Sequence, residues 1–143
     1  PAGSATFSSI PSGTKYIIIS WNEISTAATA SMQVQLGDAG GIESSGYVST
    51  GQEQNNSSTA SESLTTGMSV SIQGTSRVLS GHMLLTLLDA SSNLWVSSHS
   101  AKLDTDRITG GGGSKSLSAE LTTLYIVLTA GAYDAGSINI LYW

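Results

Sequence analysis

HMLLTLLDASSNLWVSSH, residues 82–99, contains two apolar segments separated by the polar stretch DASSN. Each segment has the length of a typical strand, and a loop of about five small polar residues is a common connection in a β-hairpin. We therefore predict antiparallel strands over 81–88 and 94–99. This hairpin is the clearest indication of a β fold in the sequence.

Alternation of apolar and polar residues continues in both directions from the hairpin. In SMQVQLG (31–37) and GMSVSIQG (67–74) every second residue is apolar, as in a half-buried antiparallel strand. Further strands are predicted over 5–10, 15–24, 45–50, 124–129 and 136–143. The stretch SLSAELTT predicts at most one short helical turn, from Leu117 to Leu121. About nine strands predict a single all-β domain over 1–143, an antiparallel, jelly-roll-like β-sandwich.

Composition and charge exclude several classes of function. The chain has five Lys and Arg residues against ten Asp and Glu, a formal net charge of -5, and no cysteine. Scattered cations form no basic stripe that neutralises phosphates, so no nucleic acid is expected as a partner. No apolar run approaches the ~20 residues of a membrane-spanning helix, so no membrane insertion is expected. The lack of cysteine excludes disulfides and thiolate metal ligands.

Two long segments without a strand pattern are predicted to be loops. They are TGQEQNNSSTASES (50–63) and AKLDTDRITGGGGSKS (101–116). Loops longer than ~12 residues in a compact domain are commonly functional or mobile. The glycine run Gly110–Gly113 is predicted to be flexible. The candidate ligand-binding side chains of the first loop are Gln54, Asn55 and Asn56.

Motifs that carry catalytic chemistry are absent from the sequence. The Gly-x-Ser-x-Gly pattern of a nucleophile elbow does not occur, and the glycine run is followed by SKSL rather than by the end of a phosphate-binding loop. His82 and His99 identify no catalytic triad, because serine is so abundant that some hydroxyl will lie near any imidazole. We expect no enzymatic activity and no cofactor.

Asp104 and Asp106, in the sequence DTDR, are weak candidates for calcium ligands. A calcium loop requires acidic or amide residues at alternate positions, followed by a glycine and a distal glutamate, and Arg107 and Ile108 interrupt that series. A solvated loop in which Arg107 pairs with an aspartate is the favoured interpretation. The sequence therefore predicts no metal site here.

Trp95 and His99 lie on the same face of the second hairpin strand, because side chains alternate along a strand. If the aliphatic residues of the other face form the core, Trp95 points outward and could stack against a sugar ring or a neighbouring subunit. If the register is reversed, Trp95 belongs to the core. With the first orientation, Trp95 and His99 are candidate ligand-binding residues.

The sequence DAGSINILYW, residues 134–143, is apolar on both faces toward its end. Ile138, Ile140 and Tyr142 point one way, whereas Leu141 and Trp143 point the other. One face can pack into the core of the sandwich. The other face would stay exposed to water unless another subunit packs against it. We therefore predict that Leu141 and Trp143 lie at an oligomer interface.

Three stretches resemble a family of small β domains in bacteriophage virion proteins, found at the tips of tail fibres and head fibres. They are SATFSSIPSGTKYIIISWNEIST (4–26), MQVQLGDAGGIESSGYVS (32–49) and the final DAGSINILYW. The shared features are a Phe-Ser-x-Ile-Pro segment that leads to a tyrosine, a Gly-Gly turn after a Gln-Leu-Gly strand end, and a later Gly-Tyr. Their residues here are Phe7, Ser8, Ile10, Pro11, Tyr16, Leu36, Gly37, Gly40, Gly41, Gly46 and Tyr47.

The resemblance implies a jelly-roll-like sandwich, a homotrimer, and a place on the surface of a virion beside other virion proteins. The expected function is a structural fibre-tip domain that attaches to a host-surface receptor, and the expected receptor is a glycan. Receptor specificity would then reside in the long loops, which match no family motif. Two alternatives stay open: a capsid-decorating protein with no host ligand, and a carbohydrate-binding module of a secreted protein.

Overall fold

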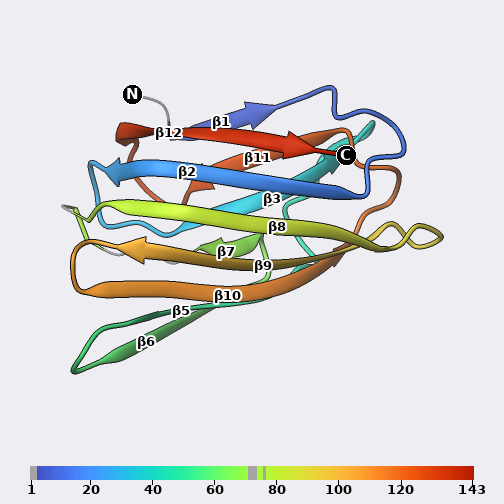
Figure 1. The fold of residues 1–143 in the computed structure, drawn as a ribbon. Helices are drawn as coiled ribbons and strands as arrows, with labels where there is room; N and C mark the ends of the chain where they lie inside the picture. The colour runs from blue at the N-terminus through green and yellow to red at the C-terminus, as the bar shows by residue number, and fades with distance from the viewer. Residues whose placement is uncertain (1–2, 71–73, 76) are drawn as a thin grey trace.

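Two antiparallel β-sheets pack face to face in the computed structural model, which describes residues 3–70, 74–75 and 77–143 (Figure 1). No helix forms in this part of the chain. The strands are β1 (Ser4–Phe7), β2 (Tyr16–Thr26), β3 (Met32–Asp38), β4 (Gly41–Ile42), β5 (Val48–Gln54), β6 (Thr59–Leu64), β7 (Met68–Val70), β8 (Leu79–Asp89), β9 (Leu94–Leu103), β10 (Arg107–Ser116), β11 (Thr123–Leu128) and β12 (Tyr133–Tyr142).

The larger sheet has the strand order β12-β2-β8-β9-β10-β5-β6, and the smaller has the order β1-β11-β3-β4 with β7 also paired to β3. The predicted hairpin is confirmed as β8 and β9, where Leu87 and Trp95 are cross-strand partners. The prediction of an antiparallel β-sandwich is confirmed as well, with twelve strands instead of about nine.

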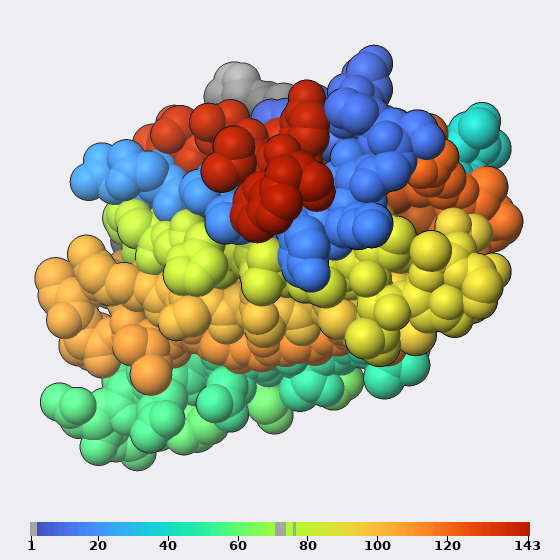
Figure 2. Space-filling view, turned by 45° about the vertical axis from the view of Figure 1, so that its right-hand side comes forward, coloured from blue at the N-terminus to red at the C-terminus, as the bar shows by residue number. Residues whose placement is uncertain are grey.

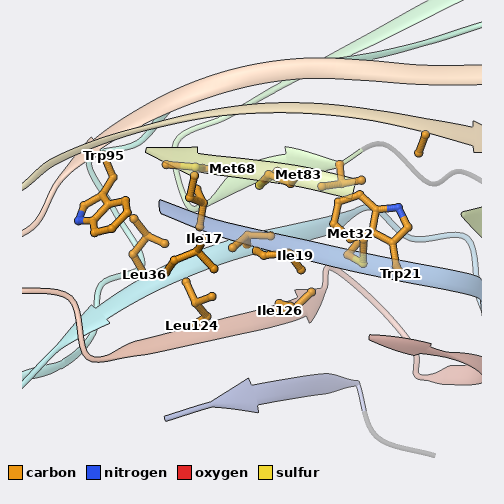
Figure 3. Packing of buried hydrophobic residues seen from close by; sticks show 14 of the residues in the cluster. Ile17, Ile19, Trp21, Met32, Leu36, Met68, Met83, Trp95, Leu124 and Ile126 are labelled. Atoms are coloured by element: carbon orange, nitrogen blue, oxygen red, sulfur yellow. The ribbon is translucent and has the colours of Figure 1, made fainter. Parts of the chain in front are cut away.

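Alternate residues of both sheets fill the space between them. Burying an aliphatic or aromatic side chain of this kind stabilises the fold by roughly 1.5–3 kcal/mol. In Figure 3, Trp95 and Trp21 lie at opposite ends of the cluster, and Ile17 and Ile19 of β2 lie between them. The smaller sheet contributes Met32, Val34, Leu36, Leu124 and Ile126 to the same core.

Both segments predicted to be long loops contain strands, so these two predictions are wrong. The segment 50–63 holds the end of β5 and most of β6, and the segment 101–116 holds the end of β9 and all of β10. Neither β6 nor β10 has an alternating apolar pattern. Backbone pairing with β5 and β9 holds them in the sheet instead.

The glycine run Gly110–Gly113 is not a flexible loop but the middle of β10, between β9 and β5. A Cβ atom on Gly111 would lie 2.3 Å from the Thr50 carbonyl oxygen and 2.7 Å from the His99 ring. A Cβ on Gly113 would lie 2.9 Å from Ser49. Close packing on the inner face of the sheet therefore requires glycine at positions 111 and 113.

Two smaller predictions also need correction, and part of a third lies outside the described residues. Residues 117–121 contain a bend at 118–119 and no helical turn, although Leu117 and Leu121 are buried. The strand predicted over 45–50 begins only at Val48. In the segment 67–74 the strand covers Met68–Val70, and the rest of the predicted strand, 71–73, lies outside the described residues.

Candidate functional site

An open cleft of about 530 Å³ lies at the end of the larger sheet where β9 turns into β10 and β5 turns into β6. Figure 1 shows both turns at the same end of the molecule, and Figure 2 shows their side chains projecting one above the other. We call this the hairpin cleft. Its lining residues are Gln54, Asn55, Asn56, Lys102, Thr105, Asp106, Arg107 and Ile108.

A row of three cross-strand neighbours forms one wall of the cleft. Ile108 of β10 is paired with Lys102 of β9 on one side and with Gln54 of β5 on the other. All three are exposed, and Ile108 keeps 62% of its surface accessible. An aliphatic side chain therefore lies between a cation and an amide, which suits a ligand with both apolar and polar surfaces.

A buried carboxylate supports the cleft from the inner side of the sheet. Glu53 is only 5% exposed, forms an ion pair with Arg77, and accepts a second contact from Arg107 at 3.5 Å between Oε1 and Nη1. A buried carboxylate needs such partners because its desolvation is costly. Arg107, which lines the cleft, is thus held in place by its contact with Glu53.

The β5–β6 turn fixes the amide of Asn55. Its carboxamide oxygen accepts hydrogen bonds from the backbone N–H groups of Ser57, at 2.9 Å, and Ser58, at 2.7 Å. This is the turn geometry that asparagine commonly stabilises with its own side chain. Because the oxygen is engaged in the turn, the amide nitrogen is the group that Asn55 can offer to a ligand.

The two aspartates of the β9–β10 turn have different surroundings. Asp104 has φ of 58°, and its Oδ1 atom accepts a hydrogen bond from the Val78 N–H at 2.9 Å. Asp106 faces the cleft, with its Oδ1 atom 3.8 Å from Arg107 Nε. Among the described residues no group of three or more His, Asp or Glu side chains is arranged to hold a metal ion.

Of the two orientations left open for Trp95, the structure has the inward one. Trp95 is 2% exposed and belongs to the core. His99 is buried on the same face, with its Nε2 atom 3.4 Å from the Thr109 hydroxyl, and burial lowers its pKa from 6.5 to about 4. Neither side chain reaches the surface, so this placement gives no support to ligand binding by Trp95 or His99.

Leu141 and Trp143 lie on the outer surface, at the end of β12, with 62% and 56% of their surfaces exposed. Trp143 stacks on Tyr16, which is also exposed. We call these three residues the aromatic patch. In Figure 2 the last residues of the chain, in red, stand on the surface beside the blue start of β2.

The sheet register brings together cleft residues that are far apart in the sequence. Gln54, Asn55 and Asn56 were predicted as ligand-binding residues and line the cleft, as does the weak metal candidate Asp106. Lys102, Thr105 and Ile108 were not predicted as site residues, because no pattern in the segment 101–116 shows which strands it pairs with.

Comparison of the chain with known protein families, with curated proteins and with solved structures found no match. The described residues include no helix that is long and apolar enough to span a membrane.

Proposed function

We propose that this chain is an attachment domain of a bacteriophage virion, of the fibre-tip type, and that the hairpin cleft binds a host-surface glycan. The observation that carries the proposal is the lining of the cleft, where amides, a hydroxyl and charged groups surround the exposed side chain of Ile108. A sugar presents hydroxyl groups around its ring and C–H groups on its faces. Both kinds of surface find a partner in this cleft.

The place on a virion rests on the resemblance in the framework of the sandwich. The resembling residues have structural roles here: Tyr47 is buried, and its hydroxyl accepts the Leu36 N–H at 2.7 Å and donates to the Glu43 carbonyl oxygen at 2.8 Å. They hold the chain between β3 and β5. The cleft lies outside these motifs, as expected for a domain that keeps a common framework and varies its receptor site.

The aromatic patch supports assembly with other virion subunits. Exposed tryptophan and tyrosine side chains are enriched at protein interfaces. We propose that the patch packs against further copies of the chain in a homotrimer, as the resemblance implies. This contact would serve assembly, whereas the hairpin cleft would serve attachment.

The proposed function is tested by binding of the purified chain to an array of bacterial surface oligosaccharides and to intact bacteria. Ile108→Asp should abolish retention, because a charged group replaces the apolar wall of the cleft. Val48→Asp is the matched control, since Val48 is also exposed on the larger sheet but lies outside the cleft. Absence of binding to every oligosaccharide and every strain would contradict an attachment role.

A second candidate is a capsid-decorating protein with no host ligand, and the aromatic patch is the observation that favours it. An exposed apolar patch fits a contact with other virion subunits as well as a contact between copies. In that case the chain would bind phage capsids stoichiometrically, Trp143→Ala would weaken this binding, and Ile108→Asp would leave it unchanged.

A further inference from the structure

We propose that the ligand of the hairpin cleft is an acidic glycan, and that Lys102 binds a carboxylate group of this ligand. The inference rests on the proposed function and specifies its substrate class. Lys102 lies on the outer face of β9, is exposed, and lines the cleft. Among the described residues no carboxylate lies within 4.0 Å of its Nζ atom, so the ammonium group is available to a ligand.

The charges in and beside the cleft favour an anion there over the rest of the surface. Three of the five cations of the chain lie in or beside the cleft, namely Lys102, Arg77 and Arg107. The acids around them are Glu53, Asp104 and Asp106. The charges of these six groups cancel, and the remaining residues carry the net charge of -5. Two of the remaining acids, Glu23 of β2 and Asp134 of β12, lie at the same end of the sheet but outside the cleft lining. An acidic ligand meets less repulsion at the cleft than over the remaining surface.

Hydrogen-bond donors predominate among the groups that the cleft offers. Asn55 has its oxygen engaged in the turn and presents its amide nitrogen. The only carboxylate of the lining, Asp106, lies beside Arg107, which partly compensates its charge. Lysine, arginine and amide donors around one opening complement a ligand rich in acceptors, and charge-assisted hydrogen bonds are the strongest of these contacts.

The row formed by Lys102, Ile108 and Gln54 defines how a ligand would be oriented across the three strands. Neighbouring strands lie about 4.8 Å apart, so roughly 10 Å separates the strand of Lys102 from that of Gln54. A glycan that lies across the three strands can place its carboxylate at Lys102, the C–H face of a ring on Ile108, and hydroxyl groups near Gln54.

The test uses pairs of oligosaccharides that differ only in their carboxyl groups. Oligogalacturonate and sialyllactose are immobilised together with their carboxyl-reduced forms, and retention of the full chain is measured at low and at physiological ionic strength. We expect at least about tenfold weaker retention on the reduced forms, the difference that one hydrogen bond to a charged group makes. Added salt should weaken binding to the acidic forms only.

Lys102→Gln should remove the preference for the acidic form and leave binding to the reduced form unchanged. Lys15→Gln is the matched control, because it changes the net charge of the chain equally at an exposed lysine outside the cleft. Equal retention of acidic and reduced forms, or an equal effect of the two lysine substitutions, would overturn the inference and leave glycan binding intact. Retention of neither form would overturn the inference, and failure on the wider array of surface oligosaccharides would overturn the proposed function as well.

Discussion

Trp143 stacks on Tyr16, with the ring centroids 5.7 Å apart and the ring planes at 21°. The backbones of the same two residues exchange hydrogen bonds in both directions, each of 3.1 Å. The pair therefore continues the β2–β12 ladder beyond Tyr142, the last residue of β12. Both rings also keep a large exposed surface, 56% for Trp143 and 40% for Tyr16.

Trp143→Ala should lower the free energy of unfolding by about 1 kcal/mol, because it removes an aromatic pair but keeps the backbone hydrogen bonds. Leu141→Ala is the control, compared at a protein concentration where the chain is monomeric, since Leu141 belongs to the same aromatic patch but to no aromatic pair. Urea denaturation of both variants measures the difference. An equal effect of the two substitutions would mean that the stacking contributes nothing to stability.

Light scattering at several protein concentrations should show a trimer for the unmodified chain. Trp143→Ala should shift the mass toward that of the monomer, 14.7 kDa. Ile108→Asp, which changes the opposite end of the sheet, should leave the trimer intact. A monomer at every concentration would contradict assembly through the aromatic patch.

Stability should fall as the pH decreases from 6.5 toward 4, and His99 is the cause. Burial lowers the pKa of His99 from 6.5 to about 4, so in this range the unfolded chain binds a proton that the folded chain does not. Stability is fully present above the pKa of the unfolded state, and about 2 kcal/mol should be lost between pH 7 and pH 5.

Denaturation of His99→Gln at the same two pH values checks this prediction. The variant should lose the dependence on pH, whereas His82→Gln should keep it, because His82 is exposed. If all three proteins show the same pH dependence, the effect belongs to other groups.

Gly110 and Gly111 are neighbours on β10 but should respond oppositely to substitution. Gly111→Ala should destabilise the fold by about 2 kcal/mol or more, because the new Cβ atom would meet the Thr50 carbonyl oxygen at 2.3 Å. Gly110→Ala should be neutral or slightly stabilising, since its Cβ would lie 3.5 Å from the nearest atom. Thermal unfolding of the two variants compares them directly. Similar losses at both positions would contradict the packing argument.

Lys115 and Glu43 form a partly buried ion pair, and Lys115 also lies 5.4 Å from the centroid of the Tyr47 ring. Burial alone would raise the pKa of Glu43, but Lys115 and Ser118 outweigh it and lower the pKa. Glu43→Gln should cost about 2 kcal/mol because it leaves the lysine without a counter-charge. In a double-mutant cycle, Lys115→Met should cost less in the Glu43→Gln background than alone. Additive effects would contradict coupling of the pair.

The strands with apolar side chains could be predicted from the sequence. The alternation in 31–37 predicted β3, and the two apolar segments around DASSN predicted β8 and β9. The expectation that β3 is half-buried is wrong, because its polar residues Gln33 and Gln35 are buried as well. β10 could not be predicted in this way, since glycine carries no side chain and its pairing is made by the backbone alone. β6 could not be predicted from an apolar pattern either, because polar residues predominate in it.

The candidate site was predicted only in part, for the same reason. Gln54, Asn55 and Asn56 were found because they are polar residues in a segment without an apolar pattern. Lys102 and Ile108 became site residues only through the register of β9, β10 and β5. Trp95 was ambiguous because a strand pattern shows which residues share a face but not which face is the inner one.

The aromatic patch and the hairpin cleft lie at opposite ends of the same sheet. Val96 of β9 is paired with Thr86 of β8, which is in turn paired with Tyr16 of the aromatic patch. Lys102, on the same strand as Val96, lines the cleft. At about 3.3 Å per residue, roughly 20 Å separate the two positions. Subunits joined through the patch would therefore leave every cleft open. Such a particle would bind multivalently, so that weak contacts at single clefts add up to strong avidity for a surface with a repeating glycan.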